Sequence, residues 1–150
     1  MSGISGLGGF GVSASGLRAE RMRMEVAASN IANAETTRGP EGTPYRRRLV
    51  VFSEQLDQTM GAAGAGGAGR DLPGGVEIAS IEQDPSPFRT VHDPGHPDAN
   101  ADGIVELPNV DIAMEMVDLA SAARAYEANL TALRSLKTAA ESALTIGGNA

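Results

Sequence analysis

Acidic and amide side chains at alternate positions give the sequence its strongest candidate for metal chemistry. Asp98, Asn100, Asp102 and Gly103 follow the pattern D-x-N-x-D-G, which opens a calcium-binding loop. Such a loop closes with a Glu that binds the ion through both oxygens, but Asn109 stands at that position. Prolines precede the loop where a flanking helix should lie. Asx turns explain the same residues, so the sequence favours a turn over a calcium site.

The histidines offer a second possible metal site. His92 and His96 are four residues apart, a spacing that would place two ligands on one face of a helix. Pro94 and Gly95 lie between them and prevent that helix, and no third ligand stands nearby. We therefore expect a surface loop without a metal.

The sequence supports phosphate binding and covalent catalysis no better than it supports metal binding. Gly64, Gly66 and Gly69 match G-x-G-x-x-G, yet no apolar strand precedes them and Pro73 follows where a helix should open. A flexible loop over residues 61–69 is the better interpretation. The chain contains no G-x-S-x-G motif and no Cys. We expect no enzyme, no cofactor and no disulfide.

The composition predicts a protein that gains stability by assembly. The 150 residues suggest one domain, or one domain with helical extensions. Apolar residues make up 41%, but only 3% are aromatic and 19 are Gly, so an independent core would be thin. The net charge of −7 argues against nucleic acid as the main ligand, although it leaves room for a local basic patch.

The sequence also bears on membranes and export. No apolar run reaches the roughly 18–20 residues that cross a membrane. Residues 1–11 lack the basic and apolar regions of a cleavable secretory signal, so any export is expected to use another route.

The C-terminal region predicts one long helix over residues 112–146, with Asp111 as N-cap and glycines after its end. At about 1.5 Å per residue it would be roughly 50 Å long. Apolar side chains recur in alternating steps of three and four, the spacing of a coiled-coil seam. This narrow stripe comprises Met116, Leu119, Ala123, Tyr126, Leu130, Leu133, Lys137, Ala140 and Leu144, with Lys137 the single interruption.

A partner helix is predicted near the other end of the chain, over residues 10–34. Phe10, Leu17, Met24 and Ile31 recur every seven residues along it. The two helices could form an antiparallel or an intermolecular coiled coil. An ordinary helical hairpin inside one globule remains the alternative.

The middle of the chain predicts short strands. Residues 45–52 and 76–81 read as a hairpin, and residues 88–92 as a further short strand. Three consecutive arginines at 46–48 lie in the first strand. They either protect a solvated strand edge from aggregation or form a patch for an acidic neighbouring subunit.

Signature motifs near both ends resemble those of the bacterial flagellar rod and hook proteins. Residues 28–34 read ASNIANA, and the second signature comprises residues 109–112, residues 115–116 and the sequence AYEAN at 125–129. The resemblance covers nearly the whole chain, and an insert at 61–69 departs from the family pattern. Features typical of proximal-rod subunits are the short length and the motifs at residues 39–46, 93–97 and 100–110.

The resemblance implies a mainly α fold with a small β-rich middle. Residues 1–35 and 109–150 would form the inner coiled-coil layer of a helical tube, and residues 36–108 a small outer domain. Asn30 and Asn33 would cap or bridge at the end of the first helix. The expected assembly interface joins the two seams to asparagines of the signatures: Phe10, Leu17, Met24, Asn30, Ile31, Asn33, Met116, Leu119, Tyr126, Asn129, Leu130 and Leu133.

The resemblance further implies an axial, structural role in the flagellar basal body, in the rod that spans the periplasm. The subunit would polymerise with other proximal and distal rod subunits and transmit torque to the distal rod and hook. Its other partners would be the adapter between rod and inner-membrane ring, that ring itself, and the type III export apparatus, through which it would pass without a cleaved signal. Alternatives are another helical assembly or secretion-apparatus protein, an export chaperone, or a calcium-loop binding module.

Overall fold

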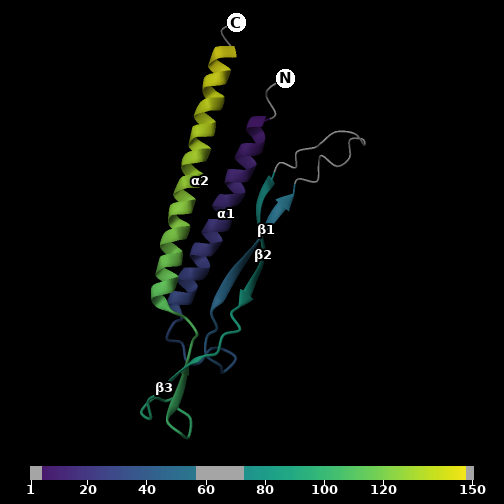
Figure 1. Cartoon of the computed structure of the whole chain (residues 1–150). Helices are drawn as coiled ribbons and strands as arrows, with labels where there is room; N and C mark the ends of the chain where they lie inside the picture. The colour runs from purple at the N-terminus through teal and green to yellow at the C-terminus, as the bar shows by residue number, and fades with distance from the viewer. Residues whose placement is uncertain (1–4, 57–72, 148–150) are drawn as a thin grey trace, which may run out of the picture. The chain divides into compact units, whose positions relative to one another are not determined.

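The computed structural model describes residues 5–56 and 73–147, and its regular structure is mainly helical (Figure 1). Two long helices begin and end this part of the chain, and four strands lie between them in sequence. The expected fold class, mainly α with a small β-containing middle, is confirmed. The elements are α1 (Ser5–Ala32), β1 (Arg48–Leu56), β2 (Pro73–Gln83), β3 (Arg89–His92), β4 (Ile104–Leu107) and α2 (Ile112–Gly147).

The helix boundaries show where local sequence decides and where tertiary contact decides. Asp111 caps α2 as predicted, because its Oδ1 accepts hydrogen bonds from the backbone N–H groups of Ala113 at 2.9 Å and Met114 at 3.4 Å. By contrast, α1 begins five residues before the predicted start, in spite of its glycines. A Cβ at Gly9 would lie 3.2 Å from the Leu136 side chain, so α2 packs against this turn and offsets its weak helix propensity.

The strands form two separate two-stranded sheets. β1 pairs with β2, which confirms the predicted hairpin, although β1 starts at Arg48 instead of residue 45. β3 pairs antiparallel with β4, from Arg89 opposite Leu107 to His92 opposite Ile104. The sequence predicted β3 but assigned no strand at β4. The glycine-rich loop at 61–69 lies outside the described residues.

Between β3 and β4, the candidate calcium motif forms turns. The Asn100 Oδ1 accepts hydrogen bonds from the backbone N–H groups of Asp102 and Ile104, each at 2.9 Å, which confirms the Asx-turn interpretation. Asp98 is bound by Thr37, whose hydroxyl donates to its carboxylate at 2.7 Å. Gly103 closes the turn with a φ of 71°, a conformation that favours glycine. Within residues 5–56 and 73–147, no three acidic or histidine side chains gather as a metal site.

The described chain divides into two compact units, each containing part of both helices. Unit 1 contains residues 5–21, 52–56, 73–79 and 123–147, and unit 2 contains residues 22–51 and 80–122. Among the described residues, Pro108 is buried in unit 2, and the other buried apolar side chains are all Ala or Val. They are Ala19 in unit 1, and Val26, Ala27, Ala34, Val105, Val110 and Ala122 in unit 2. Neither helix, over its described length, is apolar enough to cross a membrane.

Candidate assembly interface

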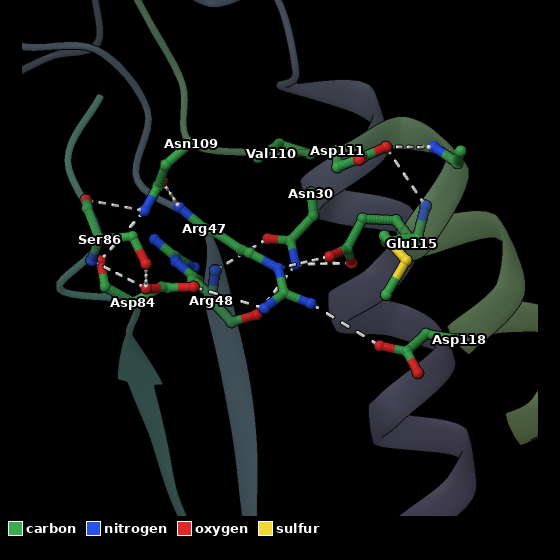
Figure 2. Close-up of polar contacts among 12 residues, drawn as sticks. Asn30, Arg47, Arg48, Asp84, Ser86, Asn109, Val110, Asp111, Glu115 and Asp118 are labelled. Carbon is green, nitrogen blue, oxygen red and sulfur yellow. Dashed lines mark hydrogen bonds and ion pairs between the residues drawn. The ribbon is translucent and has the colours of Figure 1, made fainter. Parts of the chain in front are cut away.

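Asn30, near the end of α1, is the centre of a buried polar cluster in unit 2 (Figure 2). Its side chain is 1% exposed. The Asn30 Nδ2 donates to the Arg48 carbonyl and to Glu115 Oε2, each at 2.9 Å. The Asn30 Oδ1 accepts from the Arg48 N–H at 3.0 Å and from the Tyr45 hydroxyl at 2.9 Å. Two donors and two lone pairs are therefore all used.

The two bonds between Asn30 and Arg48 replace a neighbouring strand. A residue in a sheet exchanges N–H and C=O bonds with its partner, and here a side-chain amide supplies both groups. The contact fixes which residue of β1 lies against α1.

Glu115, in the first turns of α2, brings a carboxylate into the same cluster. It is only 2% exposed, and burial of a charge requires a paired, hydrogen-bonded partner. Arg47 provides it, since the Arg47 Nε donates to Glu115 Oε1 at 2.6 Å. With Asn30 bound to the other oxygen, both sides of the carboxylate are satisfied.

Arg47 extends the ion pairs to two further carboxylates. Its Nη1 lies 3.4 Å from Asp84 Oδ2, and its Nη2 lies 3.7 Å from Asp118 Oδ2. Asp118 also accepts a hydrogen bond from Arg23 at 2.9 Å. Burial disfavours the charge of Arg47, yet hydrogen bonds and charge interactions with Glu115 and Asp84 outweigh it and raise the pKa of its guanidinium. Arg47 therefore stays cationic, and its charge is paired with carboxylates inside unit 2.

Asp84 and Asn109 connect the turn after β2 to this cluster through hydrogen bonds. Hydrogen bonds from Ser86, and secondarily from Arg47, lower the pKa of the Asp84 carboxyl. The Asn109 Oδ1 accepts from the Arg47 N–H at 2.9 Å, and its Nδ2 donates to the carbonyls of Asp84 and Ser86, each at 3.2 Å. We call these groups the polar hub: the backbone of Arg48, and the side chains of Asn30, Arg47, Asp84, Asn109, Glu115 and Asp118.

In unit 1, the two helices meet differently, through small residues and glycine. A Cβ at Gly16 would lie 3.0 Å from Asn129 Nδ2, and one at Gly9 would lie 3.2 Å from Leu136. Moving along α1 from Gly9 to Gly16 moves the contact backwards along α2, so the helices run antiparallel there. On another side of α1, the Ser15 Oγ accepts a hydrogen bond from the Val76 N–H of β2 at 3.1 Å.

Comparison with known proteins identifies the family. Residues 10–40 match the family described as flagella basal body rod protein, and residues 101–146 match the flagellar basal body rod FlgEFG protein C-terminal family. The chain is 47% identical to the flagellar basal-body rod protein FlgC of Bacillus subtilis, in an alignment covering 91% of this chain and 94% of that protein. It is 43% identical to FlgC of Borreliella burgdorferi, with coverage of 90% and 93%. The identity to FlgC of Salmonella typhimurium is 42%, with coverage of 92% and 95%.

The chain belongs to the FlgC family of flagellar basal-body rod proteins. The resemblance drawn from the two signatures is confirmed. The family is one of structural rod proteins of the flagellar basal body, and the chain covers nearly the full length of these relatives.

In this FlgC-family chain, two of the predicted interface residues stand next to the glycines at which α2 approaches α1. Gly9 and Gly16, which α2 approaches, stand one position before Phe10 and Leu17. Met116 is largely exposed, at 60%. The other large side chains of the predicted interface are half-buried: Phe10, Leu17, Tyr126, Leu130 and Leu133 in unit 1, and Met24, Ile31 and Leu119 in unit 2.

The three asparagines of the predicted interface have different surroundings. Asn30 lies in the polar hub, where it bridges α1, β1 and α2. Asn33 follows the end of α1, and its Nδ2 donates to the Ser29 carbonyl at 2.8 Å, which also accepts the Asn33 backbone N–H at 3.1 Å. Asn129 is half-buried against Gly16.

Sequence reasoning missed the role of Arg47 and Glu115. Arg47 was interpreted as a surface charge within a strand, whereas it precedes β1 and pairs with a carboxylate 68 residues later in the chain. One signal was available, because Glu115 lies in the second signature and Asn30 in the first. The structure joins the two signatures by a hydrogen bond.

Proposed function

We propose that this flagellar basal-body rod protein is a proximal-rod subunit. It polymerises with copies of itself and with other rod proteins into a helical tube, which transmits torque from the motor ring to the distal rod and hook. The similarity to FlgC proteins over nine-tenths of the chain supports this assignment.

In the assembled rod, residues 1–35 and 109–150 form an inner layer of coiled-coil helices, and residues 36–108 form an outer domain. The predicted seam residues supply the contacts between subunits. The half-buried state of Phe10, Leu17 and Leu130 in the single chain supports this, because each still has apolar surface to bury.

The observation that carries the proposal is the exposed apolar surface of α2. Solvent-facing apolar side chains in groups are typical of interaction sites, whereas scattered ones are ordinary. Two groups lie at the two ends of α2. They are Ile112, Met114, Met116 and Val117 near its start, exposed by 43–65%, and Leu144 and Ile146 near its end, exposed by 76% and 77%.

The proposed partners are those of a proximal rod. They comprise proximal and distal rod subunits, the adapter between rod and inner-membrane ring, and that ring. The subunit reaches the periplasm through the flagellar type III export apparatus, without a cleaved signal peptide. The family assignment supports this location.

Complementation tests the proposal. The chain is expressed in a motile bacterium whose own FlgC gene is deleted, and hook–basal bodies are purified and imaged by negative stain. We expect the chain in the purified rods and restored swimming. Rods that assemble and rotate without the chain would refute the proposed role.

A further inference from the structure

A groove of about 340 Å³ opens in unit 2, on a part of the chain that the rod role leaves unassigned. The turn after α1 forms one wall and the turn after β2 the other. Two half-buried rings, Tyr45 and Phe88, line it together with Pro40 and Pro44. The groove is therefore partly apolar, and its walls are held in place by β1 and by the polar hub.

The groove carries positive charge that the unit does not neutralise. The Arg46 guanidinium lies 4.2 Å from the centre of the Phe88 ring and donates to the carbonyls of Asp84 at 3.0 Å and Ser86 at 2.9 Å. Carbonyls orient a guanidinium but do not cancel its charge. Arg48 adds an exposed side chain over the Tyr45 ring, at 5.8 Å.

Arg46 and Arg48 differ in this respect from Arg47, whose charge is met by Glu115 and Asp84. Over the described residues, neither of the other two arginines forms an ion pair. Glu41 is the single carboxylate lining the groove, so two cations face one anion in a chain whose net charge is −7. Such a site fits an acidic segment with some apolar surface.

The same chain presents such a segment at its β3–β4 hairpin. All four residues of β3 are exposed, and Val91 and Ile104 expose 43% and 37% of their surface. Asp102 lies exposed in the connecting turn, and Glu106 lies exposed on β4. Neither carboxylate has a side-chain partner in the described part of the chain, whereas Asp98 is already bound by Thr37 and Arg38.

We propose that the groove beside Arg46 and Arg48 receives the β3–β4 hairpin of a second copy of this chain, with Asp102 of that copy paired to Arg48. The groove and the hairpin are different surfaces of one molecule, so the contact is heterologous and repeats from copy to copy instead of closing a dimer. It thereby specifies one of the subunit contacts of the proposed rod, and it depends on that proposal.

Disulfide cross-linking is the sharpest test, because the chain has no Cys of its own. A chain with both Arg48→Cys and Asp102→Cys is incorporated into rods, and purified basal bodies are oxidised and separated on a non-reducing gel. We expect a ladder of linked copies. The control pair, Arg48→Cys with Glu77→Cys, uses an exposed carboxylate of unit 1 and should yield at least about tenfold fewer dimers.

The outcomes separate this inference from the proposed function. If the Cys-free parent chain does not enter rods, the proposed function fails. If the parent enters rods and the paired cysteines do not link, the groove does not hold the hairpin. A link from Arg48→Cys to a different rod protein overturns the second copy as the occupant.

A charge exchange gives an independent readout. Arg48→Glu changes an exposed side chain whose backbone contacts to Asn30 are retained, so unit 2 should fold normally. Each contact should weaken by about fivefold or more, since a like-charge pair replaces an attractive one. Repetition around the rod then reduces swimming strongly. Cells that carry Arg48→Lys should swim normally, and adding Asp102→Lys to Arg48→Glu should restore swimming. If the double variant enters rods and its cells still swim poorly, the proposed pairing is wrong.

Discussion

The two compact units use opposite means of holding their helices. In unit 2, α1 and α2 are joined through side-chain hydrogen bonds and ion pairs of the polar hub, with Asn30 and Glu115 fully buried. In unit 1, α2 approaches α1 at Gly9 and Gly16, and the large side chains beside this contact stay half-buried. The hub is satisfied within one chain, whereas unit 1 retains apolar surface.

This difference indicates which half of the subunit can fold alone. A buried polar network stabilises a unique arrangement only when every member has its partner, and the hub meets that condition. A pair of helices with few buried apolar groups gains little free energy against the entropy of ordering them. We therefore expect unit 2 to be formed in the free subunit and unit 1 to depend on neighbours.

The largest effect is expected from Leu130→Asp in unit 1. The change places a carboxylate on the half-buried face of α2, and an unpaired charge at a buried interface costs roughly several kcal/mol. The subunit should be exported and its unit 2 folded, yet no rods, hooks or filaments should form. Electron microscopy and immunoblots of exported subunits provide the measurement.

Glu127 gives the matched control on the exposed face of the same helix. Glu127→Gln should leave rods and swimming near normal. Working flagella with Leu130→Asp would mean that this stripe is not an interface between helices, and would remove the basis for the coiled-coil layer.

In unit 2, Glu115→Ala should cause the largest loss of stability. It leaves Arg47 with a partly buried charge and removes one partner of Asn30, a change that costs about 3–5 kcal/mol in comparable networks. Urea unfolding followed by circular dichroism measures it. Glu127→Ala, which removes an exposed carboxylate, should cost less than about 0.5 kcal/mol. Similar values for the two variants would contradict the central role of the hub.

Asn30→Ala should be the next largest. It removes the partner of the Arg48 backbone and of a Glu115 oxygen, and leaves the Tyr45 hydroxyl only a 3.5 Å contact with the Ser29 hydroxyl, so we expect a loss of about 2 kcal/mol. Asn129→Ala is the matched control in unit 1, because no side-chain hydrogen bond holds that amide within the described residues. If it destabilises the free subunit as much as Asn30→Ala, the contrast between the units is wrong.

Hydrogen exchange on the free subunit tests the same contrast without mutation. Amides of α1 and α2 inside unit 2, at residues 22–32 and 112–122, should exchange about tenfold or more slowly relative to those at 5–21 and 123–147. Uniform protection along both helices of a proven monomer would show that unit 1 needs no neighbour.

Much of the fold followed from local signals. The start of α2 was predicted because Asp111 is a strong N-cap and the apolar stripe is long and uninterrupted by Gly or Pro. The hairpin of β1 and β2 followed from alternation. The start of α1 was missed, since the helix there depends on packing of Leu136 against Gly9 and not on its own propensity.

Less of the candidate site than of the fold could be predicted from the sequence. Periodicity selected Phe10 and Leu17 for the assembly interface, which stays a prediction. The contact of α2 with α1 inside the chain falls one position earlier, at Gly9 and Gly16, and periodicity did not indicate these glycines because it follows large apolar residues. The sequence did not predict the hub because its partners are distant, with Glu115 standing 85 positions after Asn30. A buried ion pair has no periodic signature, and the arginine run at 46–48 looked uniform although its three members have different roles.

The smallest effect concerns acid. The pKa of Asp84 is lowered in the folded protein, first by Ser86 and then by Arg47, so its carboxylate stabilises the fold above its usual pKa of about 3.9. That contribution is lost as the pH falls through the lowered folded value. Asp84→Asn removes this titration, so its unfolding free energy should fall less steeply than wild type between pH 5 and pH 3, by less than about 1 kcal/mol in total because the ion pair is partly exposed. Urea unfolding at several pH values measures the two slopes.

Asp93→Asn, in an exposed turn of the same unit, is the control, and its unfolding free energy should change with pH as that of wild type does. Parallel curves for Asp84→Asn and wild type would show that the charge of Asp84 adds no stability to the fold.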